Sequence, residues 1–205
     1  MAKLGLGINV HDESINRIKW TFDNFERIYL SFSAGKDSTV MLHLVAQEAQ
    51  RRNKKIGLLL VDLEGQYKLT IDHALEMIEI YKDVLEVYWC CLPIALRNAV
   101  SVYEPKWTCW DDEKQEDWIR QIPDIAISDV NYFPFFKKNM EFEDFVPLFG
   151  EWYSKGKSTA CLVGIRADES LNRFRTIASS SKVKKQDKQY TTKVTENVFN
   201  VYPIY

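Results

Sequence analysis

The chain has 205 residues, 46% of them hydrophobic and 27% charged, so it can form one soluble domain with a sizeable core but scarcely two. The net charge of -2 and the pI near 6.0 exclude a general attraction for nucleic acid or anionic membranes, although a local basic patch leaves nucleic acid open as a partner. There is neither a secretory signal nor an apolar run approaching roughly 18 residues, so we expect a cytoplasmic protein without membrane contact.

The sequence between residues 27 and 61 predicts a strand–helix–strand unit. Residues 27–32 form a short apolar run that enters a tight loop, and a helix is expected to begin near Asp37 or Ser38. Residues 56–61 form a continuous apolar run that is typical of a buried parallel strand. An amphipathic helix before this unit is predicted by apolar residues at helical spacing: Ile15, Ile18, Phe22 and Phe25.

The alternation of strands and helices continues along the chain. A second helix is expected around residues 69–78, and further strands are expected at 84–91 and 160–165. We therefore predict an α/β fold, a doubly wound and mostly parallel sheet with helices on both faces.

Three segments depart from this alternation within a single domain of residues 1–205. Residues 101–150 carry aromatic residues among prolines and acids, which predicts an insertion or lid of short helices and loops. The basic segment at 178–192 predicts a mobile loop, either a solvated charge run or a loop that closes over phosphates or nucleic acid. The apolar end of the chain leads us to expect that a C-terminal region is missing.

The cysteines and two of the histidines indicate no chemistry. The four cysteines form no CxxC pair, so in a reducing compartment we expect thiols, most of them buried. His43 and His73 both fall in expected helices, and we expect them to pack or to face solvent.

The loop after the first strand has the residues best suited to bind phosphate. Such a turn exposes successive backbone N–H groups at a helix N-terminus, where the helix dipole favours anions. Lys36 adds a positive charge, and Asp37 is a candidate ligand for the Mg²⁺ that accompanies a nucleoside triphosphate. The alternative is a plain turn with a Ser or Asp helix cap. The loop consists of Ser33, Ala34, Gly35, Lys36, Asp37 and Ser38.

This loop resembles the SGGKDS signature of the PP-loop, or N-type, ATP pyrophosphatases, with Ala34 in place of the second-position glycine. Two further segments resemble phosphoadenosine phosphosulfate (PAPS) reductases, in the same order along the chain. Residues 61–67 look like their VDTG-like segment, and residues 164–170 with Arg173 and Arg175 look like their G-x-R-x-x-[QE]-S…R stretch. The resemblance implies a Rossmann-like, adenine nucleotide alpha hydrolase-like fold that binds ATP or PAPS with Mg²⁺.

The resemblance also implies binding residues beyond the loop, at the carboxyl ends of the parallel strands. Asp62 is expected near the adenosine, with a turn or helix cap as the alternative. Gly164 and Arg166 follow the last of these strands, and the guanidinium of Arg166 suits phosphate or sulfate, with a surface salt bridge as the alternative. Arg173 is a weaker candidate for the same ligand.

The tryptophan-containing segment 107–112 resembles the branch typified by the immunoglobulin-binding regulator A-like proteins. Core packing of a lid is the alternative for its tryptophans. The alternative roles of Cys109 are a redox thiol and an iron–sulfur ligand, but the cysteines lack the spacing of cluster ligands.

Adenylation is the chemistry that we expect: an acceptor attacks the α-phosphorus of ATP and pyrophosphate leaves, with Lys36 and Asp37 as catalytic residues. PAPS reduction is not expected, because the reductases use a thiolate from a C-terminal ECG-x-H-like motif that this sequence lacks. The alternative function is a non-catalytic, nucleotide-binding regulator or scaffold that acts with a protein partner, in transcription regulation or DNA modification. A structural protein with a vestigial loop is a third alternative.

Overall fold

The computed structural model describes residues 7–100, 102–166, 169–178 and 182–204. The helices in chain order are α1 (Val10–Asn24), α2 (Lys36–Arg52), α3 (Lys68–Tyr81), the 3₁₀ helix η1 (Asp112–Asp117), α4 (Phe142–Ser154) and α5 (Leu171–Ala178). The strands are β1 (Arg27–Ser31), β2 (Ile56–Val61), β3 (Leu85–Cys90), β4 (Ala95–Arg97), β5 (Lys106–Thr108), β6 (Thr159–Val163), β7 (Thr191–Lys193) and β8 (Val198–Val201).

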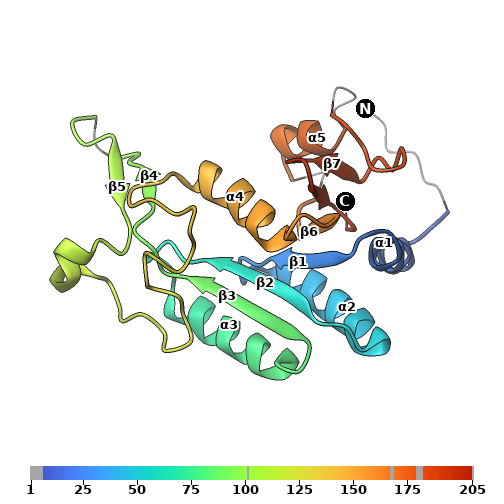
Figure 1. Cartoon of the computed structure of the whole chain (residues 1–205), viewed down its shortest axis with the longest axis horizontal. Helices are drawn as coiled ribbons and strands as arrows, with labels where there is room; N and C mark the ends of the chain where they lie inside the picture. Colours follow the sequence, from blue (N-terminus) through green and yellow to red (C-terminus); the bar gives the residue numbers. More distant parts are fainter. Residues whose placement is uncertain (1–6, 101, 167–168, 179–181, 205) are drawn as a thin grey trace.

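A six-stranded sheet with the order β3-β2-β1-β6-β8-β7 forms the centre of the molecule. All of its neighbouring strands are parallel except β7 and β8, which are antiparallel. Helices α2 and α3 lie on one face of this sheet and α4 lies on the other (Figure 1). The predicted α/β fold with a mostly parallel sheet is therefore confirmed. No helix within the described ranges is long and apolar enough to cross a bilayer.

The strand order reverses at β1. The chain passes from β1 outward to β2 and β3, and then returns to place β6 on the other side of β1. Ser31 pairs with Leu59 of β2 and with Val163 of β6, so β1 and β6 end at the same level and β2 continues to Val61. In open α/β sheets a ligand binds at such a reversal, outside the carboxyl ends of the strands.

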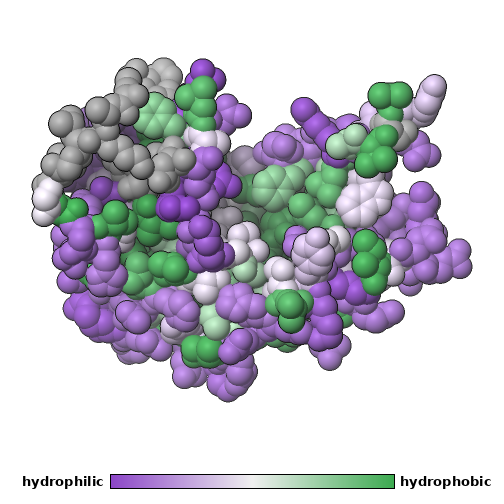
Figure 2. All heavy atoms as spheres, turned by 180° about the vertical axis from the view of Figure 1, so that it is seen from behind, coloured by the Kyte–Doolittle hydropathy of each residue, from purple (hydrophilic) through white to green (hydrophobic). Residues whose placement is uncertain are grey.

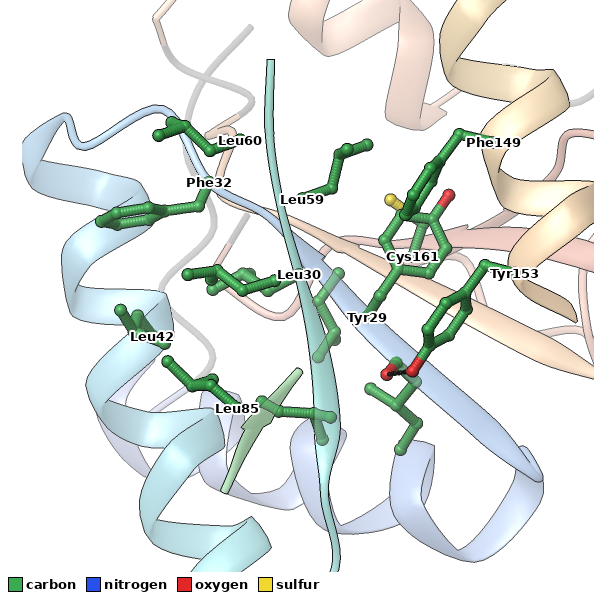
Figure 3. Close-up of a cluster of buried hydrophobic side chains, with 14 of the residues drawn as sticks. Tyr29, Leu30, Phe32, Leu42, Leu59, Leu60, Leu85, Phe149, Tyr153 and Cys161 are labelled. Carbon is green, nitrogen blue, oxygen red and sulfur yellow. Dashed lines mark hydrogen bonds between the residues drawn. The ribbon is translucent and has the colours of Figure 1, made fainter. Parts of the chain in front are cut away.

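The central strand β1 packs against both helical layers because successive side chains of a strand point to opposite faces. Leu30 points toward Leu42 of α2, whereas Tyr29 points toward Phe149 and Tyr153 of α4 (Figure 3). The ring centroid of Tyr29 lies 5.4 Å from that of Phe149 and 5.2 Å from that of Tyr153. These aromatic contacts fix α4 over the sheet.

The segments that depart from the alternation contain more regular structure than the sequence indicated. Strands β4 and β5 pair as an antiparallel hairpin that projects from the body of the molecule (Figure 1). Near its tip Val100 and Val102 are 96% and 88% exposed, which adds an apolar projection at one side of the surface (Figure 2).

Two segment boundaries in the structure also differ from those expected from the sequence. The range 142–150, expected in the lid, belongs to α4, a helix that leads into β6. The basic segment expected as a loop at 178–192 ends in β7, which pairs with β8, while residues 179–181 of it lie outside the described residues. The start of α4 and the pairing of β7 with β8 depend on packing against the rest of the fold, which local composition does not show.

A buried carboxylate joins the end of α2 to α1. Glu48 is 7% exposed and accepts hydrogen bonds from Arg51 and Arg52, and Arg52 also pairs with Asp23 of α1. The hydrogen bonds from Arg51 and Arg52 lower the pKa of Glu48 from 4.5 to about 2, against the opposing effect of burial. The ionised form of Glu48 is therefore favoured in the folded protein.

We predict that this cluster makes stability depend on pH in the acid range. Because the folded-state pKa is depressed, the stabilisation is present above the unfolded pKa of about 4.5 and is lost as the pH falls toward about 2. The full contribution is about 3 kcal/mol. Urea unfolding of the wild-type protein and of Glu48→Gln between pH 2 and 6 should give curves that converge at the acid end; parallel curves would contradict the prediction.

Candidate functional site

The 33–38 loop consists of a strained turn after β1, residues 33–35, and the first three residues of α2. Ala34 has a φ of 56°, in the left-handed region, whereas Gly35 has an extended conformation and is the N-cap of α2. A left-handed conformation costs an alanine roughly 1–2 kcal/mol relative to its normal backbone. The position where this chain departs from the glycine of the resembled signature is thus the one at which glycine is most favourable.

Hydroxyl groups hold the 33–38 loop together. Ser38, 4% exposed, donates through Oγ to the carbonyl oxygen of Gly35 at 3.0 Å and accepts from the backbone N–H of Ser33 at 3.3 Å. The hydroxyls of Ser33 and Ser38 are 3.0 Å apart. These contacts shape the turn, while the first N–H groups of α2 have no partner within the helix and face the loop.

The two candidate catalytic residues have different surroundings. The ammonium group of Lys36 is exposed, and among the described residues it has no hydrogen-bond or ion-pair partner. Asp37, with a side chain 21% exposed, lies with Oδ2 3.4 Å from Nε of Arg166. The structure therefore brings Asp37 and Arg166 together from positions 129 residues apart in the sequence.

Gly164 allows the end of β6 to approach the 33–38 loop. A Cβ atom at this position would lie 3.0 Å from both N and Cα of Ser38 and 3.2 Å from the carbonyl carbon of Asp37. All three are backbone atoms of the first turn of α2, which cannot move aside as a side chain can. The absence of a side chain at Gly164 is therefore a packing requirement of the candidate phosphate site.

The arginines after β6 share one carboxylate. Glu169 pairs with Arg173, and its Oε1 lies 3.8 Å from a terminal nitrogen of Arg166. Arg166 and Arg173 are both partly exposed, with side chains 36% and 45% accessible. The resembled stretch continues through Ala167 and Asp168, which lie outside the described residues.

A cavity of about 210 Å³ lies beside the loop, between the ends of β1 and β2 and the start of α3. Its walls combine loop atoms with mostly apolar side chains, as is usual for small-molecule sites. Ser33 and Ala34 line one side, and Thr70, Ile71 and Ala74 of α3 line the other. The cavity can hold a flat apolar group next to the N-terminus of α2.

Asp62 lines this cavity, but its carboxylate is engaged by protein donors. The side chain is 1% exposed and accepts from the backbone N–H of Glu64 at 2.9 Å, from Nε1 of Trp89 at 2.8 Å, and from Arg120. Asp62 therefore anchors the turn and the insertion, a role closer to the capping alternative than to direct contact with adenosine.

Glu64 fixes the insertion in the same way. It is 4% exposed, and its carboxylate accepts from the backbone N–H of Trp110 at 2.7 Å and from that of Ile119 at 3.2 Å. The indole N–H of Trp110 donates to the carbonyl oxygen of Asp62 at 2.7 Å. Glu64 and Trp110 both have a positive φ, 65° and 52°, so this contact joins two strained residues.

The thiols are placed for packing. All four cysteines are free and buried, as the sequence predicted. Burial raises the pKa of Cys109 to about 11 and that of Cys161 to about 12, and it raises those of Cys90 and Cys91 as well. A buried thiol with a raised pKa is a poor nucleophile, because the thiolate is the reactive form.

A family model described as the phosphoadenosine phosphosulfate reductase domain matches residues 27–205. The chain belongs to this family. The match confirms the superfamily that the loop and the two later segments indicated, without deciding the branch. The uncharacterized protein YbdN of Escherichia coli (strain K12) is 43% identical over 206 residues, which cover 99% of this chain and 50% of YbdN. The chain thus spans about half the length of this curated relative.

Several contacts around the candidate site were not found from the sequence. Glu64 lies within the 61–67 segment but was given no role, and Arg120 belongs to no motif; their contacts join segments 46 and 58 residues apart. His73, which was expected only to pack or face solvent, reaches the first turn of α2 through Thr39. Helical spacing alone could have placed His73 in the N-terminal half of α3, near the cavity, but could not have identified its partner.

We predict that Gly164→Ala lowers the free energy of unfolding by about 1–3 kcal/mol, because the new methyl group meets rigid backbone of α2. The matched control is Gly65→Ala, whose Cβ would have its nearest neighbour, the carbonyl oxygen of Leu63, at 3.9 Å. Urea unfolding followed by circular dichroism compares the two. Equal losses for both variants would show that position 164 has room for a side chain.

We predict that Arg120→Met destabilises the protein by about 3 kcal/mol, because it leaves the buried carboxylate of Asp62 without its ion-pair partner. Combining it with Asp62→Asn should recover part of the loss, since the uncompensated charge is then gone. Lys82→Met, which breaks an exposed ion pair with Glu79, is the control and should cause no measurable loss. Strict additivity of the two buried substitutions would contradict the assigned contact.

Proposed function

We propose that the chain binds ATP through the 33–38 loop and cleaves the bond between its α- and β-phosphates to adenylate an acceptor. The observation that carries the proposal is the position of this loop: it joins β1 to the N-terminus of α2 at the reversal of strand order, beside an apolar cavity. The family supports an adenine nucleotide or PAPS as the ligand.

The charges around the loop suit a triphosphate. The first N–H groups of α2, which have no partner within the helix, and the exposed ammonium of Lys36 are donors for anionic oxygens. Arg166 adds a guanidinium at the end of the neighbouring strand β6. The cavity beside Ser33 and Ala34 receives the adenine, whose flat face suits apolar walls.

In the proposed reaction the acceptor supplies an electron pair to the α-phosphorus, the bond to the bridging oxygen breaks, and pyrophosphate leaves with that electron pair. The proton of the acceptor passes to solvent. No protein nucleophile is required, which agrees with the burial of all four thiols. Lys36 and the helix N-terminus stabilise charge on the departing pyrophosphate, and the loop holds the phosphates in line.

A magnesium ion fits the donors at this position. Mg²⁺ is usually bound by one or two carboxylates together with substrate phosphates and waters. Asp37 supplies one carboxylate at the N-terminus of α2, and exchange of its contact with Arg166 for the metal would free Arg166 for phosphate. When bound, the ion would neutralise phosphate charge.

The second candidate function is a nucleotide-binding regulator or scaffold that works with a partner protein. The observation that favours it is the apolar tip of the β4–β5 hairpin, where Val100, Val102 and Tyr103 are almost fully exposed. A regulator or scaffold of this kind would act in transcription regulation or in DNA modification. A cytoplasmic location is proposed under both, since the cysteines are free.

We predict that Mg·ATP raises the melting temperature of the wild-type protein more than ADP, AMP or PAPS does, because a ligand that binds only the folded state stabilises it. Lys36→Ala should weaken ATP binding about tenfold or more, the effect of losing one charge-assisted contact. Lys55→Ala, an exposed lysine at the opposite end of β2, is the matched control and should bind like the wild type.

Pyrophosphate release separates the two candidate functions. Release with Mg·ATP and a suitable acceptor supports the enzyme, whereas stabilisation by intact ATP without release supports the regulator. Stronger stabilisation by PAPS would indicate a sulfonucleotide ligand. If none of these nucleotides changed the melting temperature, both candidate functions would be ruled out.

A further inference from the structure

Helices α2 and α3 lie on the same face of the sheet and are joined by two histidine contacts (Figure 1). Near the 33–38 loop, Nε2 of His73 lies 2.9 Å from Oγ1 of Thr39. One turn further along α2 and two turns further along α3, Nδ1 of His43 lies 2.5 Å from the hydroxyl of Tyr81. Helices α2 and α3 are therefore joined by two similar hydrogen-bond contacts, one at the candidate site and one away from it.

The hydrogen-bond contact of His73 continues through Thr39 into the 33–38 loop. Oγ1 of Thr39 donates to the carbonyl oxygen of Gly35 at 2.9 Å, and the same carbonyl accepts from the hydroxyl of Ser38 at 3.0 Å. A hydroxyl has a single proton to donate, so with Thr39 donating to Gly35 the contact with His73 is made by the tautomer that carries its hydrogen on Nε2. A chain of donors thus runs from His73 through Thr39 to Gly35.

This chain of donors connects the two sides of the cavity. The loop side contains the left-handed Ala34, and the α3 side contains Ile71 and Ala74, which flank His73 in the sequence. A strained turn persists only where surrounding contacts hold it. The contact between His73 and Thr39 holds α3 at a constant separation from the 33–38 loop.

We propose that His73 is a positioning residue for the nucleotide: it holds α3 against the loop so that the cavity is preformed for the adenine. The proposal rests on the proposed nucleotide binding at this loop. His43, in contrast, joins the same two helices without reaching the loop. The contact of His73 leads through Thr39 to Gly35, whereas the contact of His43 ends at Tyr81, away from the loop.

The test measures the dissociation constant of Mg·ATP by isothermal titration calorimetry and the stability of each variant by urea unfolding. His73→Ala should weaken ATP binding about five- to tenfold, the effect of one lost hydrogen bond on a preorganised site. His43→Ala should lower stability to a similar degree and leave ATP affinity unchanged. His73→Gln, whose Nε2 also carries hydrogens, should restore most of the affinity.

A double-mutant cycle identifies the contact itself. Thr39→Val removes the hydroxyl with little change in shape, so its effect on ATP affinity should not add to that of His73→Ala. Wild-type affinity in His73→Ala, equal weakening by His43→Ala, or additive effects of the two substitutions would each overturn the positioning role. Absence of ATP and PAPS binding by the wild-type protein would instead overturn the proposed function, and the inference with it.

Discussion

The candidate site depends on the close approach of two backbone segments at the reversal of strand order. Because β6 lies beside β1, the end of β6 must pass the first turn of α2, and Gly164 makes this possible by leaving no atom between itself and Ser38. The approach then places Arg166 against Asp37. The charged residues of the site are thus arranged by main-chain packing before any ligand is considered.

Two buried carboxylates connect this edge of the sheet to the insertion. Asp62 and Glu64 would be costly to bury alone, but each accepts several hydrogen bonds from the segments that it holds. Their partners Trp110 and Arg120 stack as a cation–π pair, with the guanidinium carbon 4.8 Å from the ring centroid. The insertion is therefore held at the cavity by polar contacts, which fix its position more specifically than apolar packing would.

Three of the residues with a positive φ, Ala34, Glu64 and Trp110, lie around the same edge. The backbone N–H of Trp110 donates to the carboxylate of Glu64, and its indole N–H donates to the carbonyl oxygen of Asp62. Such strain is stable only when the rest of the fold determines it, and it is commonest at functional sites. The contact between His73 and Thr39 belongs to this support because it fixes the helix turn that follows Ala34.

The sequence by itself determined the α/β alternation, the parallel sheet and the place of the 33–38 loop, because these follow from local periodicity and from a short turn between a strand and a helix. It also placed Gly164 and Arg166 after a buried strand. The pairing of β7 with β8, the hairpin of β4 and β5 and the partners of Asp62 were decided only in the tertiary structure. The paired strands are too short to be recognised from local pattern, and Arg120 lies 58 residues from Asp62 in the sequence. A carboxylate or histidine has the same local pattern whether its partner is water, a nucleotide or another helix.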